Sequence, residues 1–304
     1  MPTITGDTCA VPHARHPSPQ REAHHRIGVC PMTVTERMQA DFARTHATRL
    51  VFDTSPRHLA GPGDARRVTH GLAAARWTRT SDPLSPEIVL RSPDYRYTVQ
   101  FDPQSATSAW WRLTAERTIN EEGWYAEFGA LVPAEILSRL TDALVLPAPA
   151  ENAVDPFQIL RSAGWDIDSS RIAHSPDGMC HVHCPTEAGT GAWKASWRVD
   201  TCSPGHGTPM GPSIWHAYLP EPVPAHLVAV FITALVDPGP LQRGMYERLG
   251  HHSAVHVRSQ VRPEQVVDAH SSRLRTIWSR ARSASRQQAT PVPSPVPSRR
   301  ATHR

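Results

Sequence analysis

A stretch that occurs twice constrains this chain more than any other feature. The first copy is GWYAEFGALVPAEILSRLTDALV at Gly123–Val145, and the second is SIWHAYLPEPVPAHLVAVFITALV at Ser213–Val236. An offset of 91 residues relates Trp124 to Trp215, and the register holds through a strand pattern, a turn and a helix pattern. The chain is therefore predicted to contain two copies of one small module, and a missed repeat would misread the whole fold.

Each copy predicts a strand followed by a helix. Trp124, Ala126 and Phe128 alternate along one side of the first copy, which is the period of a strand. Pro133 then stands at a position that suits the first residue of a helix. The residues after it carry apolar side chains at helical spacing, namely Ile136, Leu137, Leu140, Ala143 and Leu144.

The sequence before each copy completes the module. Asp64 predicts the start of a helix in the first module, and Asp155 predicts the equivalent start in the second. Strands are predicted in the first module over residues 87–91, 95–101, 110–116 and 123–129. The predicted fold is α+β, with two tandem repeats of an antiparallel four-stranded meander that has a helix before and after it. The helices should cover one sheet face and leave the other for the partner module or a ligand.

The two modules are predicted to span residues 49–147 and 148–240. Residues 1–48 are expected to form a mostly disordered extension that holds one short helix, since His, Pro and Arg dominate there without periodicity. Residues 241–282 should form a connector and an amphipathic helix. Residues 283–304 contain the run PVPSPVP and are expected to be a disordered basic tail.

Composition and charge indicate a mildly basic protein of a reducing compartment. The formal net charge is +4, and Lys194 is the single lysine beside many arginines, a bias typical of a GC-rich genome. The five cysteines are irregularly spaced, which does not indicate a disulfide framework. The first twenty residues lack the apolar core of a signal peptide, and the longest apolar run, Leu227–Val236, has about half the length that crosses a bilayer. We expect a cytoplasmic protein without a membrane partner, and either Met1 or Met32 as its start.

Several of these segments together resemble a known family. They are LAGPGD at Leu59–Asp64, RSPDYRYTVQFDP at Arg91–Pro103, the pair Trp110–Trp111, and the block that begins at Gly123. This set is similar to the DUF317 domain, also called SPDY after its turn, which is common in filamentous actinobacteria. In the second module Gly178 stands where SPDY has its tyrosine. That family has no assigned activity, so the resemblance implies a fold, a tandem arrangement and a host, and no catalytic residue.

The sequence contains one cluster with metal-binding residue types, Cys180-His-Val-His-Cys184. On a strand the two cysteines would lie about 13 Å apart, which is too far to share one ion. Aligned with the strand at 95–101, they fall on its apolar face and are predicted to be small core residues. We therefore predict no cofactor and no metal site, with His181, His183 and His206 as the remaining candidates. Nucleophile-elbow and phosphate-loop motifs are missing as well, so the protein is predicted not to be an enzyme.

Two adjacent tryptophans supply the better functional signal. Trp110 and Trp111 would point to opposite faces of a sheet. If Trp111 lies in the core, Trp110 either faces outward as a recognition anchor or packs against the other module. The leading hypothesis is a binding or adaptor protein that contacts an unknown protein partner through a sheet face. Its predicted binding residues are Trp110, Tyr95, Arg96 and Arg112.

The C-terminal segment carries the main charge asymmetry. From Arg258 to Arg304 it holds ten arginines and two acidic residues. A basic helix and tail of this kind can neutralise phosphates without reading base sequence. The alternative function is therefore association with nucleic acid, with Arg273, Arg275, Arg280, Arg282, Arg299 and Arg300 as candidate residues. The partner and the oligomeric state stay open.

Overall fold

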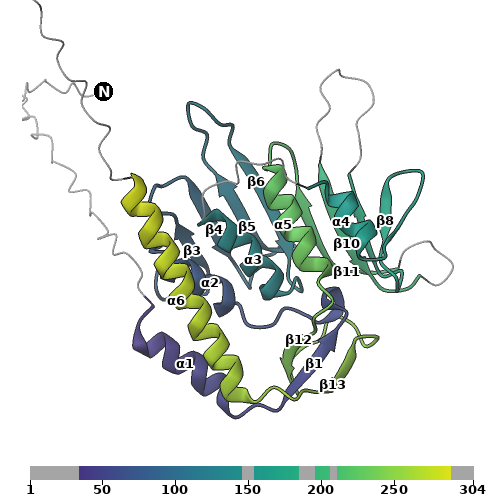
Figure 1. The fold of residues 1–304 in the computed structure, drawn as a ribbon, viewed down its shortest axis with the longest axis horizontal. Helices are drawn as coiled ribbons and strands as arrows, with labels where there is room; N and C mark the ends of the chain where they lie inside the picture. Colours follow the sequence, from purple (N-terminus) through teal and green to yellow (C-terminus); the bar gives the residue numbers. More distant parts are fainter. Residues whose placement is uncertain (1–33, 146–153, 185–195, 206–210, 289–304) are drawn as a thin grey trace, which may run out of the picture.

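The computed structural model describes residues 34–145, 154–184, 196–205 and 211–288, and its largest feature is one antiparallel sheet of ten strands (Figure 1). The first repeat supplies β2 (Thr78–Arg79), β3 (Ile88–Arg91), β4 (Tyr97–Phe101), β5 (Ala109–Ala115) and β6 (Trp124–Gly129). The second supplies β7 (Asp166–Ile167), β8 (Ile172–His174), β9 (Cys180–His183), β10 (Trp197–Cys202) and β11 (Ser213–Leu219). The two halves meet where β6 pairs with β11, so the order is β2-β3-β4-β5-β6-β11-β10-β9-β8-β7.

The predicted α+β class is confirmed, and the predicted four-stranded repeat needs correction. Each half contributes five strands. The additional strands are β2 and β7, which directly follow Trp77 and Trp165. These strands have two residues each, which is too short to show an alternating pattern in the sequence. The two halves also form one sheet, since the edges of β6 and β11 satisfy each other's backbone groups. The second module therefore lies beside the first in the sheet plane and does not cover its face.

An approximate two-fold axis relates the two halves and passes through one cross-strand pair. The offset of 91 residues makes Tyr218 the counterpart of Glu127, and Tyr218 also pairs with Glu127 across the β6–β11 junction. Helices α3 (Ala134–Leu144) and α5 (Ala225–Val236) begin at positions with the same offset and pack against each other. The halves are thus joined as in an isologous dimer, in which one surface patch meets its own copy.

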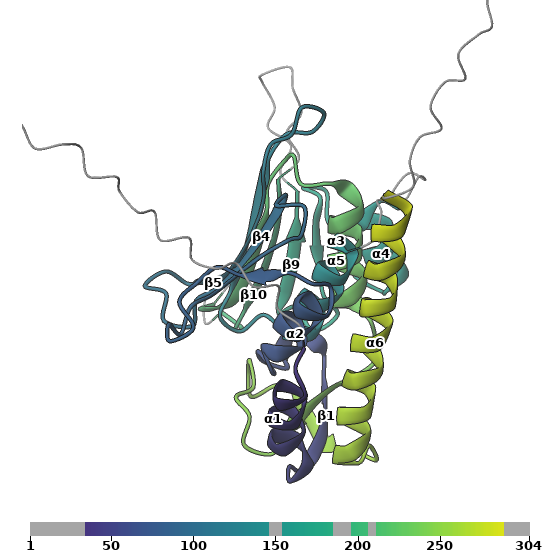
Figure 2. The ribbon, with the colours of Figure 1, turned by 90° about the vertical axis from the view of Figure 1, so that its left-hand side faces the viewer.

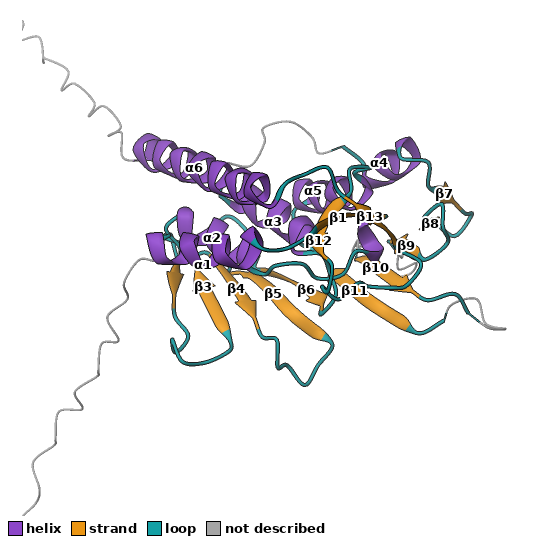
Figure 3. Ribbon diagram, turned by 90° about the horizontal axis from the view of Figure 1, so that it is seen from below, coloured by secondary structure: helices purple, strands orange, loops and turns teal. Residues whose placement is uncertain are grey.

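The helices of the repeats lie on one face of the ten-stranded sheet (Figure 3). α2 (Arg66–Ala74) precedes the strands of the first half, and α4 (Pro156–Ser162) precedes those of the second. Asp155 caps α4 as predicted, since its carboxylate accepts the backbone N–H of Phe157. Asp64 lies one residue before Ala65, the N-cap of α2, and its carboxylate accepts the backbone N–H of Arg66. One continuous apolar core lies between helices and sheet. Within the described part of the chain, the opposite sheet face carries no helix.

Residues on either side of the repeats combine into a second, smaller sheet (Figure 1). Its central strand β1 (Val51–Ser55) pairs antiparallel with β12 (Leu241–Gly244) and with β13 (Val255–Arg258). The short 3-10 helix η1 (Arg57–Leu59) follows β1, and the indole of Trp215 donates to the carbonyl of His58 at 2.8 Å. The small sheet therefore ties the segment before the first repeat to the segment after the second.

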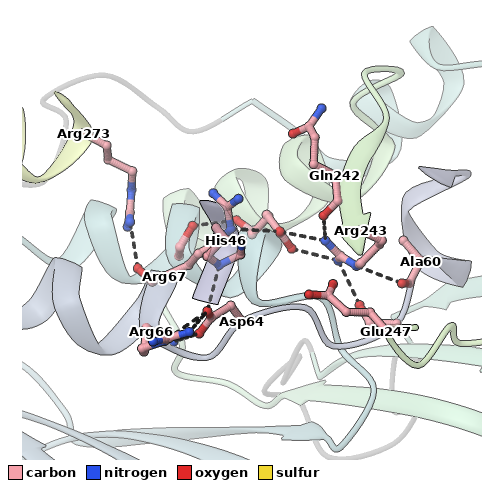
Figure 4. A network of polar contacts seen from close by, with 12 residues as sticks. His46, Ala60, Asp64, Arg66, Arg67, Gln242, Arg243, Glu247 and Arg273 are labelled. Atoms are coloured by element: carbon pink, nitrogen blue, oxygen red, sulfur yellow. Dashed lines mark hydrogen bonds and ion pairs between the residues drawn. The ribbon is translucent and has the colours of Figure 1, made fainter. Parts of the chain in front are cut away.

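A buried arginine joins this small sheet to the helical layer (Figure 4). The guanidinium of Arg243 on β12 pairs with both carboxylate oxygens of Glu135 on α3, at 2.8 and 2.9 Å. It also donates to the carbonyl oxygens of Ala60 and Gly61 at 2.9 and 3.0 Å. Burial alone would raise the pKa of Glu135, but Arg243 and Arg67 outweigh burial and hold that pKa below its ordinary value.

Two further helices complete the described structure (Figure 2). α1 (Glu36–Ala47) confirms the short helix predicted near the N-terminus, and the hydroxyl of Thr35 caps it. α6 (Pro263–Gln288) packs against α1 and α2 and continues through residues 283–288, which were predicted to belong to the disordered tail. Ala, Arg and Gln in that stretch are favourable helix formers, which accounts for the extension. No helix among the described residues is both long and apolar enough to span a membrane.

Candidate functional site: the open face of the sheet

The sheet face that points away from the helices is termed the open face (Figure 3). Val99, Leu113, Ala126, Ala217 and Val199 are buried under the helices, so the strand residues next to them turn outward. One outward row runs in cross-strand register through eight strands. Its members are Val89, Gln100, Arg112, Glu127, Tyr218, Arg198, His183 and Ile172. The six central residues are all polar or aromatic, and the row crosses both repeats.

Two tyrosines and two arginines occupy the centre of the open face. The rings of Tyr125 and Tyr218 have centroids 6.1 Å apart, and Tyr125 is 49% exposed. Arg112 and Arg198 lie on the strands on either side, and each follows a tryptophan in its own repeat. The carboxylate of Glu127 stands between Arg112 and Tyr218 in the row. Tyr and Arg side chains of this kind supply much of the binding energy at protein interfaces.

Histidines line the open face in the second half. The Nδ1 atoms of His174 and His181 are 2.9 Å apart, and Nε2 of His183 is 3.5 Å from Oδ2 of Asp200. Burial, followed by the nearby His174, lowers the pKa of His181. Burial would raise the pKa of Asp200, but the contact with His183 helps to hold that pKa below its ordinary value. In the described ranges no group of three or more His, Cys, Asp or Glu side chains could hold a metal ion, and His206 lies outside them.

The cysteines of β9 and the loop after it lie in the core, as the alignment of the repeats predicted. Cys180 is fully buried and Cys184 nearly so, and both are free thiols. Burial raises the pKa of each thiol, and the hydroxyl of Thr201 donates to Sγ of Cys180 at 3.3 Å. A protonated, buried thiol is a poor nucleophile and a poor metal ligand.

Trp110 is half-buried and packs on its own repeat. The register of β5 against β6 shifts between Ala109 and Trp111, which makes Trp110 the extra residue of a bulge. Its indole lies edge-on against Phe101, with ring centroids 6.3 Å apart. Trp111 is buried in the core, so of the two tryptophans it is Trp111 that faces inward. The bulge explains why strict alternation gave too simple an account of the two tryptophans.

The structure does not gather the predicted binding residues in one place. Tyr95 lies in the turn before β4, whereas Trp110 lies beside Phe101 at the other end of that strand. Arg96 forms an ion pair with Glu121 and lies over the ring of Tyr97, so it is engaged within the repeat. Arg112 alone of the predicted set belongs to the outward row described above.

The two tyrosines beside Arg112 are the residues that sequence reasoning missed. The repeat alignment makes Tyr218 the counterpart of Glu127, but it gives no sign that the two residues are also paired across neighbouring strands. Tyr125 could have been found, because alternation along the strand turns it to the face opposite Trp124.

The two SPDY-type turns have diverged. In the first, Tyr95 adopts the left-handed region at φ 61°, its side chain is 58% exposed, and the guanidinium of Arg91 lies 5.4 Å from its ring centroid. In the second, Gly178 takes that position at φ 69°, and Oδ2 of Asp177 lies 2.9 Å from Nε2 of His58. A residue with a Cβ costs about 1–2 kcal/mol in this region. The first turn therefore presents a tyrosine despite a local penalty, and the second contacts η1, the short helix that follows β1.

The arginines predicted to bind nucleic acid divide into two groups. Arg273 pairs with both carboxylate oxygens of Asp142 at 2.6 and 2.9 Å and donates to the carbonyl of Arg67 at 2.7 Å. It therefore holds α6 against α2 and α3 and is engaged inside the fold. Three of the remaining candidates are exposed on α6, namely Arg275, Arg280 and Arg282. The other two, Arg299 and Arg300, lie outside the described ranges.

Comparison with known families agrees with the two-repeat organisation. The model of the family described as SPDY, domain of unknown function (DUF317), matches residues 91–150 and 174–241. Each matched segment begins near the SPDY-type turn and includes the strands and the helix that meet at the two-fold axis. The two matches are consistent with two copies of this domain. No curated protein and no solved structure matches the chain.

Proposed function

We propose that this chain is a non-enzymatic binding protein that recognises a partner protein through the open face. The observation that carries the proposal is the centre of the outward row, where Arg112, Glu127, Tyr218 and Arg198 follow one another across the junction of the repeats. The ring of Tyr125, on the same strand as Glu127, lies against the ring of Tyr218. The junction of the two repeats places these side chains in the middle of a broad surface, which is where interface residues with large binding energies are found.

The size of the open face supports a protein partner. Eight strands in register, about 4.8 Å apart, extend for about 34 Å across the sheet. Strands of about five residues are about 17–20 Å long, so the face offers about 600–700 Å². A standard protein interface uses about 800 Å² on each partner. One protein surface laid along the row would therefore cover both repeats at once.

We also propose a cytoplasmic location and a filamentous actinobacterium as the host. The free thiols of Cys180, Cys184 and Cys202 support a reducing compartment. The resemblance of the turn and of the repeated block to the SPDY domain supports the host.

The test is affinity capture from lysate of the source organism with three forms of the full chain. The wild type is compared with Tyr125→Ala combined with Arg112→Glu, and with Arg161→Glu, which changes an exposed arginine on the helical side. A partner captured by wild type and control but lost with the open-face variant supports the proposal. The purified partner should then slow amide hydrogen exchange in β5, β6, β10 and β11. Equal capture by all three forms, each with unchanged circular dichroism, refutes it.

A further inference from the structure

A groove lies away from the open face, on the helical side of the molecule. It has a volume of about 700 Å³ and runs between α1, α2 and α6. Its apolar wall is formed by Val34, Ala73, Ala74, Leu274 and Trp278. This volume falls within the range of about 300–1,000 Å³ that is usual for ligand sites.

The rim of the groove is basic. Arg76, Arg275 and Arg282 line it and are exposed, and its lining contains no carboxylate. Arg76 adopts the left-handed region at φ 66° directly after α2, so the end of that helix fixes where its side chain leaves the backbone. Within the described ranges these three arginines form no ion pair with Asp or Glu. The groove therefore attracts negative charge at its edge and apolar groups along its wall.

Trp278 gives the groove a binding anchor. Its side chain is 49% exposed, while Leu274, Ile277 and Ala281 on the same helix are buried. The guanidinium of Arg282 lies 4.9 Å from the centroid of the Trp278 ring. A cation–π contact of this kind holds the indole in place before any ligand arrives, which lowers the entropy lost on binding.

We propose that this groove binds an acidic, amphipathic peptide segment of a partner protein. The apolar side of the peptide would lie on Leu274 and Trp278, and its carboxylates would face the three arginines. This is the helix-in-groove mode, in which apolar anchors recur at i, i+3, i+4 and i+7. The site is separate from the open face, so it does not depend on the function proposed above.

Charge distinguishes this occupant from the alternatives. Residues 1–33 contain Arg15, Arg21 and Arg26 against Asp7 and Glu22, and residues 289–304 contain three arginines and no acidic residue. Both terminal segments of the chain are therefore basic and would be repelled by the rim. Single-stranded nucleic acid is bound on stacking platforms of several aromatic rings, whereas the wall of this groove is mostly aliphatic.

The experiment measures binding of a designed peptide to the full chain by fluorescence anisotropy. The probe is a labelled helical peptide with leucines at i, i+3, i+4 and i+7 and glutamates on the flanking positions. The first comparison probe is a peptide of the same composition whose scrambled order breaks the leucine spacing. The second keeps the leucine spacing and has lysine in place of glutamate, and the third is a single-stranded oligonucleotide. The protein variants are Trp278→Ala, Arg275→Glu and Arg282→Glu. The matched control is Arg262→Glu, which makes the same charge change at an exposed position just before the same helix, outside the groove.

Saturable binding of the acidic peptide, weakened at least about tenfold by each groove variant and unchanged by the control, is the expected result. The scrambled and lysine-containing peptides should bind at least about tenfold more weakly. Equal binding of the scrambled peptide, or no binding of the acidic one, would overturn the proposal. It is also overturned if only the oligonucleotide binds, or if sedimentation shows a dimer that Trp278→Ala dissociates. Circular dichroism of each variant separates loss of binding from loss of the fold.

Discussion

Replacing Arg243 by methionine tests whether a buried ion pair fastens the small sheet to the helical layer. The Arg243 side chain is 0% exposed, pairs with Glu135 through two contacts and also donates to the carbonyl of Gln242 at 2.8 Å. The variant would leave Glu135 with Arg67 as its remaining ion-pair partner, at 3.1 Å. Breaking a buried pair on one side costs about 3–5 kcal/mol. We expect a loss of about 4 kcal/mol in the free energy of unfolding, a large fraction of the usual total of about 5–15 kcal/mol.

Urea titration followed by tryptophan fluorescence measures this loss. The matched double variant, Arg243→Met with Glu135→Leu, removes both charges together. Its loss in the free energy of unfolding should be smaller than the sum of the losses in the two single variants by at least about 1 kcal/mol, because neither charge is left buried alone. Amide exchange in β12 should also accelerate in the single variant. A loss below about 1 kcal/mol for Arg243→Met, with unchanged exchange in β12, would show that the pair does not hold the two parts together.

Two further predictions concern buried histidines and strained glycines. Nδ1 of His70 lies 3.2 Å from Nε2 of His270, and burial lowers the pKa of the first to about 4 and of the second to about 3. The unfolded chain binds protons more readily below pH 6.5, so the free energy of unfolding should fall from pH 6.5 towards about 4. Urea titrations should show that His70→Gln with His270→Gln flattens this fall, and an unchanged slope would contradict the assignment. Gly178→Ala should cost about 1–2 kcal/mol from its φ of 69° alone, since an added Cβ meets nothing within 4 Å. Gly61→Ala should lower the free energy of unfolding by at least about 1 kcal/mol more than Gly178→Ala, because its Cβ would collide with the carbonyl oxygen of Arg248. Equal thermal melting midpoints of the two variants would refute this difference.

The divergence of the two repeats has a physical account in the second SPDY-type turn. Burial would raise the pKa of Asp177, but its contact with His58 outweighs burial and holds the pKa below its ordinary value. Asp177 thereby fastens this turn to η1, and Gly178 relieves the left-handed strain of the turn. The first turn lacks that contact in the described structure and keeps Tyr95 at its surface. The approximate two-fold symmetry therefore applies to the sheet and the helices and breaks at these turns.

Sequence patterns were enough to predict the repeat, the main strands and helices, and much of the core. The offset between Trp124 and Trp215 identified the two modules, and alignment of the repeats placed Cys180 and Cys184 in the core. These features depend on period and offset along the chain, which are local properties of a sequence. The same patterns could not assign roles to polar residues, because an arginine such as Arg273 looks alike whether it is exposed or paired with Asp142.

Only the tertiary structure decided how the two modules meet and which surfaces stay open. Edge pairing of β6 with β11 depends on contacts between residues about 91 positions apart, for which the sequence carries no periodic signal. The same holds for the small sheet, in which Val51 lies opposite Gly244, and for the groove that brings Val34 near Trp278. The sequence by itself determined the elements and their inward faces, since burial of apolar side chains follows the local period. Their assembly into one sheet, with an open face centred on Tyr125 and Tyr218, was decided by long-range pairing of strand edges.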